Sequence, residues 1–457
     1  MKYLLKNGTV VSGNGTEMLD VLIDGEKIAE TGKNLSSDDA VVLDVSGKLL
    51  FPGFIDGHTH FDLEVAKTVT ADDFESGTRA AILGGTTFVI DYASQDKGGG
   101  TLKEGLEKWH QKADGKCSCD YSFHMSVVEW NPETEREIPE MIREGITSFK
   151  LYMTYPAMMV NDRDLYKIIK TLGEYGCFAG VHCENSGVID ALIDEAKKEG
   201  RLGPENHPLV RPAEMEAEAV HRLLVIADQA KVPVMVVHLT SEKAFQEILA
   251  ARDAGQKVYA ETCPQYLMLD DSVYSRPDFE GAKYVCAPPI RKKEDQECLW
   301  KALGEDLIQT VATDQCSFTW EQKNLGRDDF TKIPGGLPGV ETRGTLLYTY
   351  GVREGRITLE QMCRLLSENA ARLYGVYPEK GVILPGSDAD IVVFDPEKES
   401  VISAGTHAYR TDYSPYEGFV LHGGISKVFL RGQLAVEDGK IVKEKLGKYI
   451  YRGKNQL

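Results

Sequence analysis

The sequence lacks the long apolar runs that a membrane span requires. No stretch of its 457 residues approaches the roughly 18 consecutive apolar residues of a membrane-spanning helix. The amino-terminal segment MKYLLKNGTVVSGNG is interrupted by Lys6 and Asn7 before a signal-peptide core could form. We therefore expect a cytoplasmic protein that has no membrane partner.

An excess of basic residues is also missing. The chain has 71 acidic and 52 basic side chains, which gives a formal net charge of −19. A surface of this sign repels phosphate backbones, so we expect no nucleic-acid partner. Hydrophobic content of 42% and charged content of 27% are those of an ordinary globular chain.

Cysteines are few and scattered. The nine cysteines are an odd number, and Cys117 and Cys119 form the closest pair. A zinc knuckle would need a second such pair, which the sequence does not contain. A chain of this length with so few cysteines does not match a disulfide-stabilised scaffold.

Strand-like and helix-like segments alternate between residues 54 and 318. Helical patterns such as PAEMEAEAVHRLLVIADQAK lie between the strand-like runs, and this alternation predicts a parallel sheet. The eight expected strands cover residues 54–60, 87–93, 121–127, 146–153, 178–184, 232–239, 257–263 and 308–314. Eight such units favour a closed (β/α)8 barrel. The competing doubly wound sheet lacks its phosphate-binding glycine fingerprint after the first strand.

Both ends of the chain differ from this central part. They contain short β runs with Asn-Gly and Asp-Gly turns, such as YLLKNGTVV near the start and KVFLRGQLAVEDGKIV near the end. We expect them to combine into one small β domain, with residues 1–52 and 376–440 flanking a barrel of residues 53–375. The basic tail 441–457 is either a frayed end or an arm that packs on a neighbouring subunit.

Two histidines end the first barrel strand, in the segment GFIDGHTH. Side chains two residues apart on a strand point the same way, so His58 and His60 converge on one point. Histidine is the commonest metal ligand, and this spacing matches a bidentate metal clamp. The alternative is a pair of polar residues that the backbone satisfies at a strand end.

Further polar residues follow other barrel strands at the same end, where the active sites of such barrels lie. With the first pair, the set comprises His58, His60, Lys150, His182, His238 and Asp314. The other six histidines have no spacing that indicates a metal site.

Lys150 is the least usual member of this set, because strand alternation turns it into the barrel. Burial lowers an amine's pKa, and a neutral amine reacts with carbon dioxide to form a carbamate, here N6-carboxylysine. The alternative is a lysine that pairs with a carboxylate or extends out of the strand end. A carbamate at Lys150 would bridge two divalent ions, one held by His58, His60 and Asp314 and one by His182 and His238. Zinc is the first expectation, with manganese or iron as alternatives.

This order of ligands resembles the amidohydrolase superfamily and, within it, the D-hydantoinases and dihydropyrimidinases. The similarity covers nearly the whole chain and is carried by FPGFIDGHTHFD, GITSFKLYMTY, VHCEN, VHLTSEKA, ETCPQYL, APPIR, VATDQCSF and GLPGVETR. It implies the six metal ligands named above and a β-sandwich built from both chain ends. It also implies a homotetramer or homodimer that a carboxyl-terminal arm helps to assemble.

The resemblance further implies the reaction. A hydroxide bound by both metal ions would open a cyclic amide or ureide ring, such as a 5-substituted hydantoin or a dihydropyrimidine, to an N-carbamoyl amino acid. Tyr155 would stabilise the oxyanion, Asp314 would move the proton, and backbone groups of Ala287 and Leu337 would hold the ring amides.

The substituent pocket is expected in two loops, 63–70 and 154–162, where Leu63, Met158 and Met159 give an adaptable apolar surface. The alternative is that these methionines only pack the loop.

Two positions depart from relatives of this type. Gln315 stands where many relatives have histidine, and Asp62 stands where dihydroorotases usually have arginine, which argues against an anionic ring. The rival functions are an allantoinase-like hydrolase, a non-catalytic scaffold that keeps the fold, and a metal-free binding barrel.

Overall fold

Eight parallel strands form the centre of the fold in the computed structural model, which describes residues 2–65 and 68–457. They are β6 (Phe54–Thr59), β9 (Thr86–Ser94), β10 (Asp120–Ser126), β11 (Ser148–Tyr152), β12 (Phe178–His182), β13 (Val234–Val236), β14 (Val258–Thr262) and β15 (Thr310–Val311). Each strand pairs with the next one along the chain. Most of their residues are buried on both faces, which explains the nearly continuous apolar runs in the sequence.

The sheet closes between its first and last strands through Gln315. The amide of His60 donates to the Gln315 carbonyl at 2.8 Å, and Thr59 and Gln315 form a parallel bridge. Eight parallel strands in sequential order, joined in this way, confirm the predicted (β/α)8 barrel.

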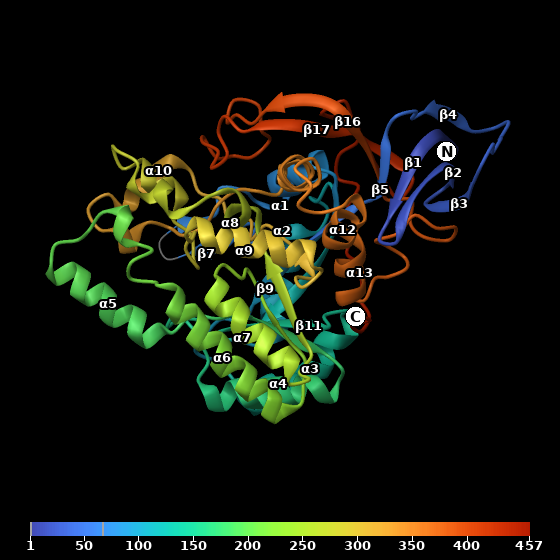
Figure 1. Cartoon of the computed structure of the whole chain (residues 1–457). Coiled ribbons are helices and arrows are strands. Elements are labelled where there is room, and N and C mark those ends of the chain that lie inside the picture. Colours follow the sequence, from blue (N-terminus) through green and yellow to red (C-terminus); the bar gives the residue numbers. More distant parts are fainter. Residues whose placement is uncertain (1, 66–67) are drawn as a thin grey trace.

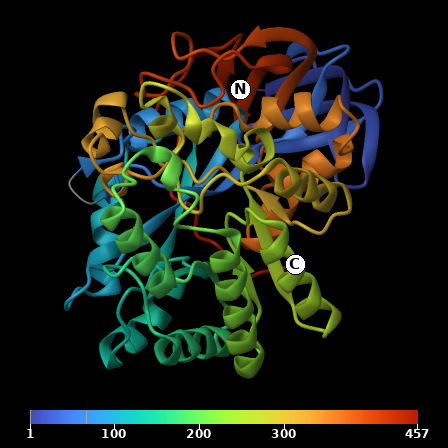
Figure 2. The ribbon, with the colours of Figure 1, turned by 60° about the vertical axis from the view of Figure 1, so that its left-hand side comes forward.

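Helices follow most of the strands and surround the barrel (Figure 1), and Figure 2 shows the same arrangement from a second side. They are α1 (Phe74–Leu83), α2 (Leu102–Ala113), α3 (Pro132–Arg143), α4 (Asp162–Glu174), α5 (Ser186–Lys198), α6 (Ala213–Ala230), α7 (Glu242–Asp253), α8 (Pro264–Met268), α9 (Lys293–Gly304), α10 (Trp320–Lys323), α11 (Arg343–Leu347), α12 (Leu359–Cys363) and α13 (Asn369–Leu373). Helix α6, which covers the predicted helical segment PAEMEAEAVHRLLVIADQAK, begins at Ala213 with Pro212 as its cap.

The two chain ends form one mostly antiparallel sheet beside the barrel, seen as blue and red strands in Figure 1. Its strands are β1 (Lys2–Ser12), β2 (Gly15–Asp24), β3 (Lys27–Gly32), β4 (Val41–Asp44), β5 (Leu49–Pro52), β16 (Ile391–Val401), β17 (Val420–Leu430), β18 (Gln433–Glu437) and β19 (Lys440–Ile441). The two ends meet where β5 pairs with β16. This confirms that both ends build one β unit. A separate two-stranded ribbon joins β7 (Glu64–Val65) to β8 (Thr68–Val69).

A buried lysine connects this sheet to the barrel. The Lys380 ammonium lies 2.7 Å from a carboxylate oxygen of Asp120, at the start of β10, and 2.7 Å from one of Asp390, just before β16. Burial opposes the charge, but the attraction of Asp390 and Asp120 raises the Lys380 pKa above its usual value. The domain boundaries after residues 52, 375 and 440 stay predictions, because these contacts do not test independent folding.

The carboxyl-terminal tail lies against its own barrel. The Ile450 amide donates to the Tyr121 carbonyl at 2.8 Å, and the Gly453 amide donates to the Gly375 carbonyl at 2.9 Å. The last residues therefore run from β10 toward α13, where Figure 1 marks the carboxyl terminus. The tail is thus not a free, solvated end. Its contact with a neighbouring subunit, and the homotetramer or homodimer, stay predictions.

Within residues 2–65 and 68–457, every helix is too short or too polar to cross a bilayer.

Candidate active site

The structure places the predicted metal ligands at the carboxyl ends of the barrel strands. His58 lies near the end of β6, Lys150 in β11, and His182 is the last residue of β12. His238 and Asp314 follow β13 and β15 after short gaps. Parallel strands end on one rim of a barrel, so these side chains share that rim.

The first group of side chains gathers around Asp314. One of its carboxylate oxygens lies 3.2 Å from Nε2 of His58 and 3.2 Å from Nε2 of His60. Nζ of Lys150 lies 3.5 Å from the same nitrogen of His58. The structure therefore brings the H-x-H pair, the lysine and the aspartate together.

The other two histidines extend this group. The ring centres of His58 and His238 lie 5.4 Å apart, and those of His238 and His182 lie 4.5 Å apart. Ligand atoms of His58, His238 and Asp314 all lie within 4.8 Å of one another. The four imidazoles are thus contiguous.

Two buried glutamates orient these imidazoles, and the sequence analysis assigned neither. Glu261, in β14, lies 2.6 Å from Nδ1 of His58, and Glu184 lies 2.7 Å from Nε2 of His182. These contacts leave Nε2 of His58 and Nδ1 of His182 as the ring nitrogens that do not contact a glutamate. Such outer partners fix the tautomer of a metal-binding histidine. The sequence could have pointed to both glutamates. Glu261 follows a run of strand residues just as the predicted ligands do, and Glu184 lies two residues after His182.

The pKa values of the two glutamates shift in opposite directions. Burial raises the pKa of Glu261 to about 8. Burial acts the same way on Glu184, but Arg211, at 2.7 Å, and His182 together lower the Glu184 pKa to about 2. Glu184 is therefore a fixed anion beside His182.

Lys150 is enclosed by aromatic rings. It is 1% exposed, and its Nζ lies 4.9 Å from the ring centre of Tyr92 and 5.2 Å from that of Tyr152. Burial lowers the Lys150 pKa to about 8, against the opposing attraction of Asp314 and Glu261. A larger neutral fraction makes this amine a better nucleophile toward carbon dioxide than an exposed lysine.

The donor set fits divalent metal ions. Burial lowers the pKa values of His58, His182 and His238, so these imidazoles stay neutral and able to bind a metal. Among the described residues, Nδ1 of His60 and Nδ1 of His238 are buried without a hydrogen-bond partner. His238 and Asp314 also have φ angles of 40° and 52°, which are unusual for residues other than glycine and cluster at functional sites.

Tyr155 lies beside this group in the loop after β11. Its ring centre is 5.2 Å from that of His182, and the Arg211 guanidinium lies 5.6 Å from the Tyr155 ring. Its φ of 65° is again in the left-handed region. Burial raises the pKa of its hydroxyl above the usual value, so the hydroxyl keeps its proton and can donate.

The predicted substituent loops lie near the same rim. Leu63 is half-buried and precedes β7. The amides of Met158 and Met159 both donate to the Tyr155 carbonyl at 2.8 Å, so the methionines belong to the turn that carries Tyr155. Ala66 and Lys67 of the first loop lie outside the described residues. The roles of Leu63 and Met159 in substrate binding stay predictions.

A buried cation joins the two segments predicted to hold the substrate ring. Nζ of Lys323 donates to the carbonyls of Val285, Pro334 and Gly336 at 2.9, 2.8 and 2.9 Å. These carbonyls flank Ala287 on one segment and Leu337 on the other. The Leu337 carbonyl itself accepts the Cys316 amide at 3.1 Å. Whether Ala287 and Leu337 contact a substrate stays a prediction.

We expect Lys323→Met to weaken substrate binding more than turnover. Three buried carbonyls would lose their donor, which costs about 3 kcal/mol of folding free energy and lets both segments shift. We expect KM to rise about tenfold, which corresponds to a loss of about 1.4 kcal/mol in binding free energy. Steady-state kinetics and thermal unfolding measure both effects. The exposed Lys332→Met is the matched control, and a folded Lys323→Met with unchanged KM would contradict this role.

Two other residues have clear structural roles at the site. Asp56 accepts the His58 amide at 3.1 Å and the Thr313 hydroxyl at 2.7 Å, so it joins the first strand to the last. The Gln315 side-chain carbonyl accepts the Gly339 and Val340 amides at 2.6 and 3.1 Å. Gln315, which stands where many relatives have histidine, thus anchors the GGLPG segment.

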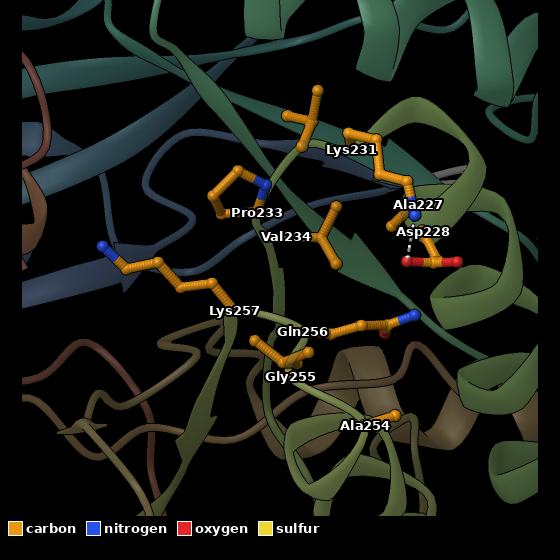
Figure 3. Close-up of a pocket in the computed structure, with 11 residues that line it drawn as sticks. Ala227, Asp228, Lys231, Pro233, Val234, Ala254, Gly255, Gln256 and Lys257 are labelled. Carbon is orange, nitrogen blue, oxygen red and sulfur yellow. Dashed lines mark hydrogen bonds and ion pairs between the residues drawn. The ribbon is translucent and has the colours of Figure 1, made fainter.

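A surface pocket lies away from this centre. Figure 3 shows its walls, which are the turns that end α6 and α7, with Lys231 paired to Asp228 at 2.9 Å. These turns precede β13 and β14, whereas His238 follows β13. The pocket is therefore at the amino-terminal end of the strands, opposite the candidate active site.

Comparisons with known proteins agree with this geometry. The model of one protein family, described as "Amidohydrolase family", matches residues 49–435. A D-hydantoinase of Geobacillus stearothermophilus is 46% identical over 99% of this chain and 97% of that protein. A D-phenylhydantoinase of Escherichia coli (strain SE11) is 39% identical over 99% of this chain and 98% of that protein. The crystal structure of a dihydropyrimidinase from Brevibacillus agri NCHU1002 superposes with a TM-score of 0.98 at 44% identity, covering 100% of this chain and 99% of that one.

Proposed function

The chain belongs to the amidohydrolase family, and from this premise we propose that it opens the ring of a 5-substituted hydantoin or a dihydropyrimidine. The product is an N-carbamoyl amino acid. The observation that carries this proposal is the meeting of Asp314 with His58, His60 and Lys150 at one rim of the barrel. Proteins that are similar along the whole chain are named for this class of substrate.

The residues present would hold two divalent ions. We assign His58, His60 and Asp314 to one ion, His182 and His238 to the other, and a carboxylated Lys150 to both. Zinc fits imidazole and carboxylate ligands, as do manganese and iron. When bound, such ions would lower the pKa of a water molecule and withdraw electron density from the ring carbonyl.

The chain's own residues supply the proton transfers and charge stabilisation. Asp314 accepts the proton of the attacking water and returns it to the ring nitrogen as the carbon–nitrogen bond breaks. The Tyr155 hydroxyl donates to the carbonyl oxygen while negative charge develops there. The attacked carbonyl carbon becomes the carboxylate of the open-chain product, and the protonated ring nitrogen becomes the amide nitrogen of its carbamoyl group.

Metal analysis combined with a substrate panel tests the proposal. The purified protein is analysed for bound metal and assayed by the loss of ultraviolet absorbance on ring opening, with hydantoin, dihydrouracil, 5-phenylhydantoin and allantoin. We expect about two ions per chain, ring opening of hydantoins or dihydrouracil, and loss of activity on chelation that added metal reverses.

Three results would contradict the proposal. Full activity in metal-free protein would remove the assigned role of the metal ligands. Opening of allantoin alone would favour the rival hydrolase of another cyclic ureide. Bound metal without turnover of any substrate in the panel would favour a non-catalytic scaffold.

A further inference from the structure

The carboxyl-terminal tail places an arginine inside the barrel, at the end opposite the candidate active site. Arg452 is 4% exposed. Its guanidinium donates to the Ser122 hydroxyl at 3.0 Å, to the Ser148 hydroxyl at 2.7 Å and to the Phe123 carbonyl. These partners belong to β10 and β11, so the terminus contributes a side chain to the barrel interior.

This position is an unusual one for a cation. The three hydrogen-bond partners among the described residues are two hydroxyls and a carbonyl, and none of them is a carboxylate. Burial of a charge without an opposite charge is unfavourable, and it lowers the Arg452 pKa to about 10. A methionine or leucine would fill the same space without this cost. The guanidinium therefore calls for a reason other than packing.

A hydrogen-bond chain leads from Arg452 to the strand of the H-x-H pair. Nδ1 of His124 lies 2.6 Å from the Ser148 hydroxyl, and its Nε2 lies 2.9 Å from the Gly57 carbonyl. A carbonyl only accepts and a guanidinium only donates. Nε2 of His124 must therefore carry the proton, and Ser148 must donate its own proton to Nδ1. The Gly57 carbonyl thus fixes the proton on Nε2 of His124, and the guanidinium fixes Ser148 as the donor to Nδ1.

The residues along this chain adjoin the predicted metal ligands. Gly57 directly precedes His58, and Ser148 lies two residues before Lys150 on the same face of β11. The His124 ring stacks on Tyr92, with ring centres 4.6 Å apart. Tyr92 in turn lies 4.7 Å from the ring centre of His58 and 4.9 Å below Nζ of Lys150.

We propose that Arg452 is a positioning residue for the active site: through Ser148 and His124 it fixes the strands that carry His58 and Lys150. The carboxyl-terminal tail is then part of the catalytic framework of its own subunit. The expected effect of Arg452 on the reaction rate rests on the proposed function. Its expected effect on metal binding rests only on the assignment of the metal ligands.

The test compares full-length variants that differ at single side chains. In Arg452→Met we expect kcat to fall about tenfold or more, because small displacements of catalytic groups cost this much, while KM stays within about twofold. We also expect the variant to lose metal more readily on dialysis against a chelator. Arg452→Lys, which keeps a buried donor, should recover part of both properties. Lys448→Met is the control, because the side chain of this exposed tail lysine pairs with Glu26 at the surface.

The outcomes separate the hypotheses. A folded Arg452→Met that matches Lys448→Met in kcat and metal retention overturns the proposal. If Arg452→Met does not fold, Ser148→Ala and Arg452→Lys take its place in the test. Normal kcat and normal metal retention in both variants overturn the proposal. Reduced kcat and reduced metal retention in both support the proposal. If the unaltered chain binds metal but opens no ring, the proposed function fails, whereas metal retention in the variants still tests Arg452.

Discussion

We expect Lys150→Ala to lose its bound divalent metal and to lose activity by about a thousandfold or more, as removal of a central catalytic group typically does. The Lys150 amine lies 3.5 Å from Nε2 of His58, between the two groups of predicted ligands. As a carbamate it would supply the one protein side chain common to both ions, so its removal disrupts both positions together. Elemental analysis and the ring-opening assay, applied to the same preparation, measure the two losses.

Chemical rescue makes this prediction specific to the carbamate. Formate, acetate or propionate added to Lys150→Ala with divalent metal should restore part of the activity, because a short carboxylate can enter the space that the lysine side chain leaves. The exposed Lys170→Ala, treated with the same acids, is the control and should not respond. Full activity in a metal-free Lys150→Ala would refute the assigned role of this residue.

The barrel could be predicted because its strands are buried on both faces. Each strand therefore appears as a short apolar run, and the first, fourth, fifth, sixth and eighth runs contain the predicted metal ligands. The ends of parallel strands meet at one rim, so the sequence order alone predicted that His58, Lys150, His182 and Asp314 lie together.

The partners of these residues could not be predicted in the same way. Glu261 contacts His58 across 203 residues of sequence. Whether a buried carboxylate binds a metal, orients a histidine or pairs with a cation depends on distances that spacing does not encode. Gln315 is a similar case, because its backbone carbonyl helps to close the barrel by accepting the His60 amide. The identity of a side chain does not indicate such a backbone contact.

The tail was the least predictable part. Its composition is basic with a few apolar residues, which is compatible with a free end, an arm on a partner or a contact with the chain itself. Only the fold shows that the Arg452 guanidinium donates hydrogen bonds to Ser122 of β10 and Ser148 of β11. A terminal segment has no neighbour on one side to limit its path, so local sequence patterns carry little information about where it packs.

We expect Tyr155→Phe to retain its metal and to lose turnover by about 100- to 1,000-fold, the usual effect of removing one donor to a developing oxyanion. The substitution removes one hydroxyl and keeps the ring that packs 5.2 Å from His182. The ring also keeps its position over the Arg211 guanidinium, so the Glu184–His182 pair is undisturbed. The loss should therefore appear in kcat, with little change in KM or in metal content.

This pattern separates a donor from a ligand. Lys150→Ala should lose metal and activity together, whereas Tyr155→Phe should lose activity alone. Tyr175→Phe, at the exposed end of α4, controls for the loss of a tyrosine hydroxyl elsewhere. If Tyr155→Phe keeps its kcat, the oxyanion is stabilised without this hydroxyl. The left-handed backbone at Tyr155 then serves to shape the turn that carries Met158 and Met159.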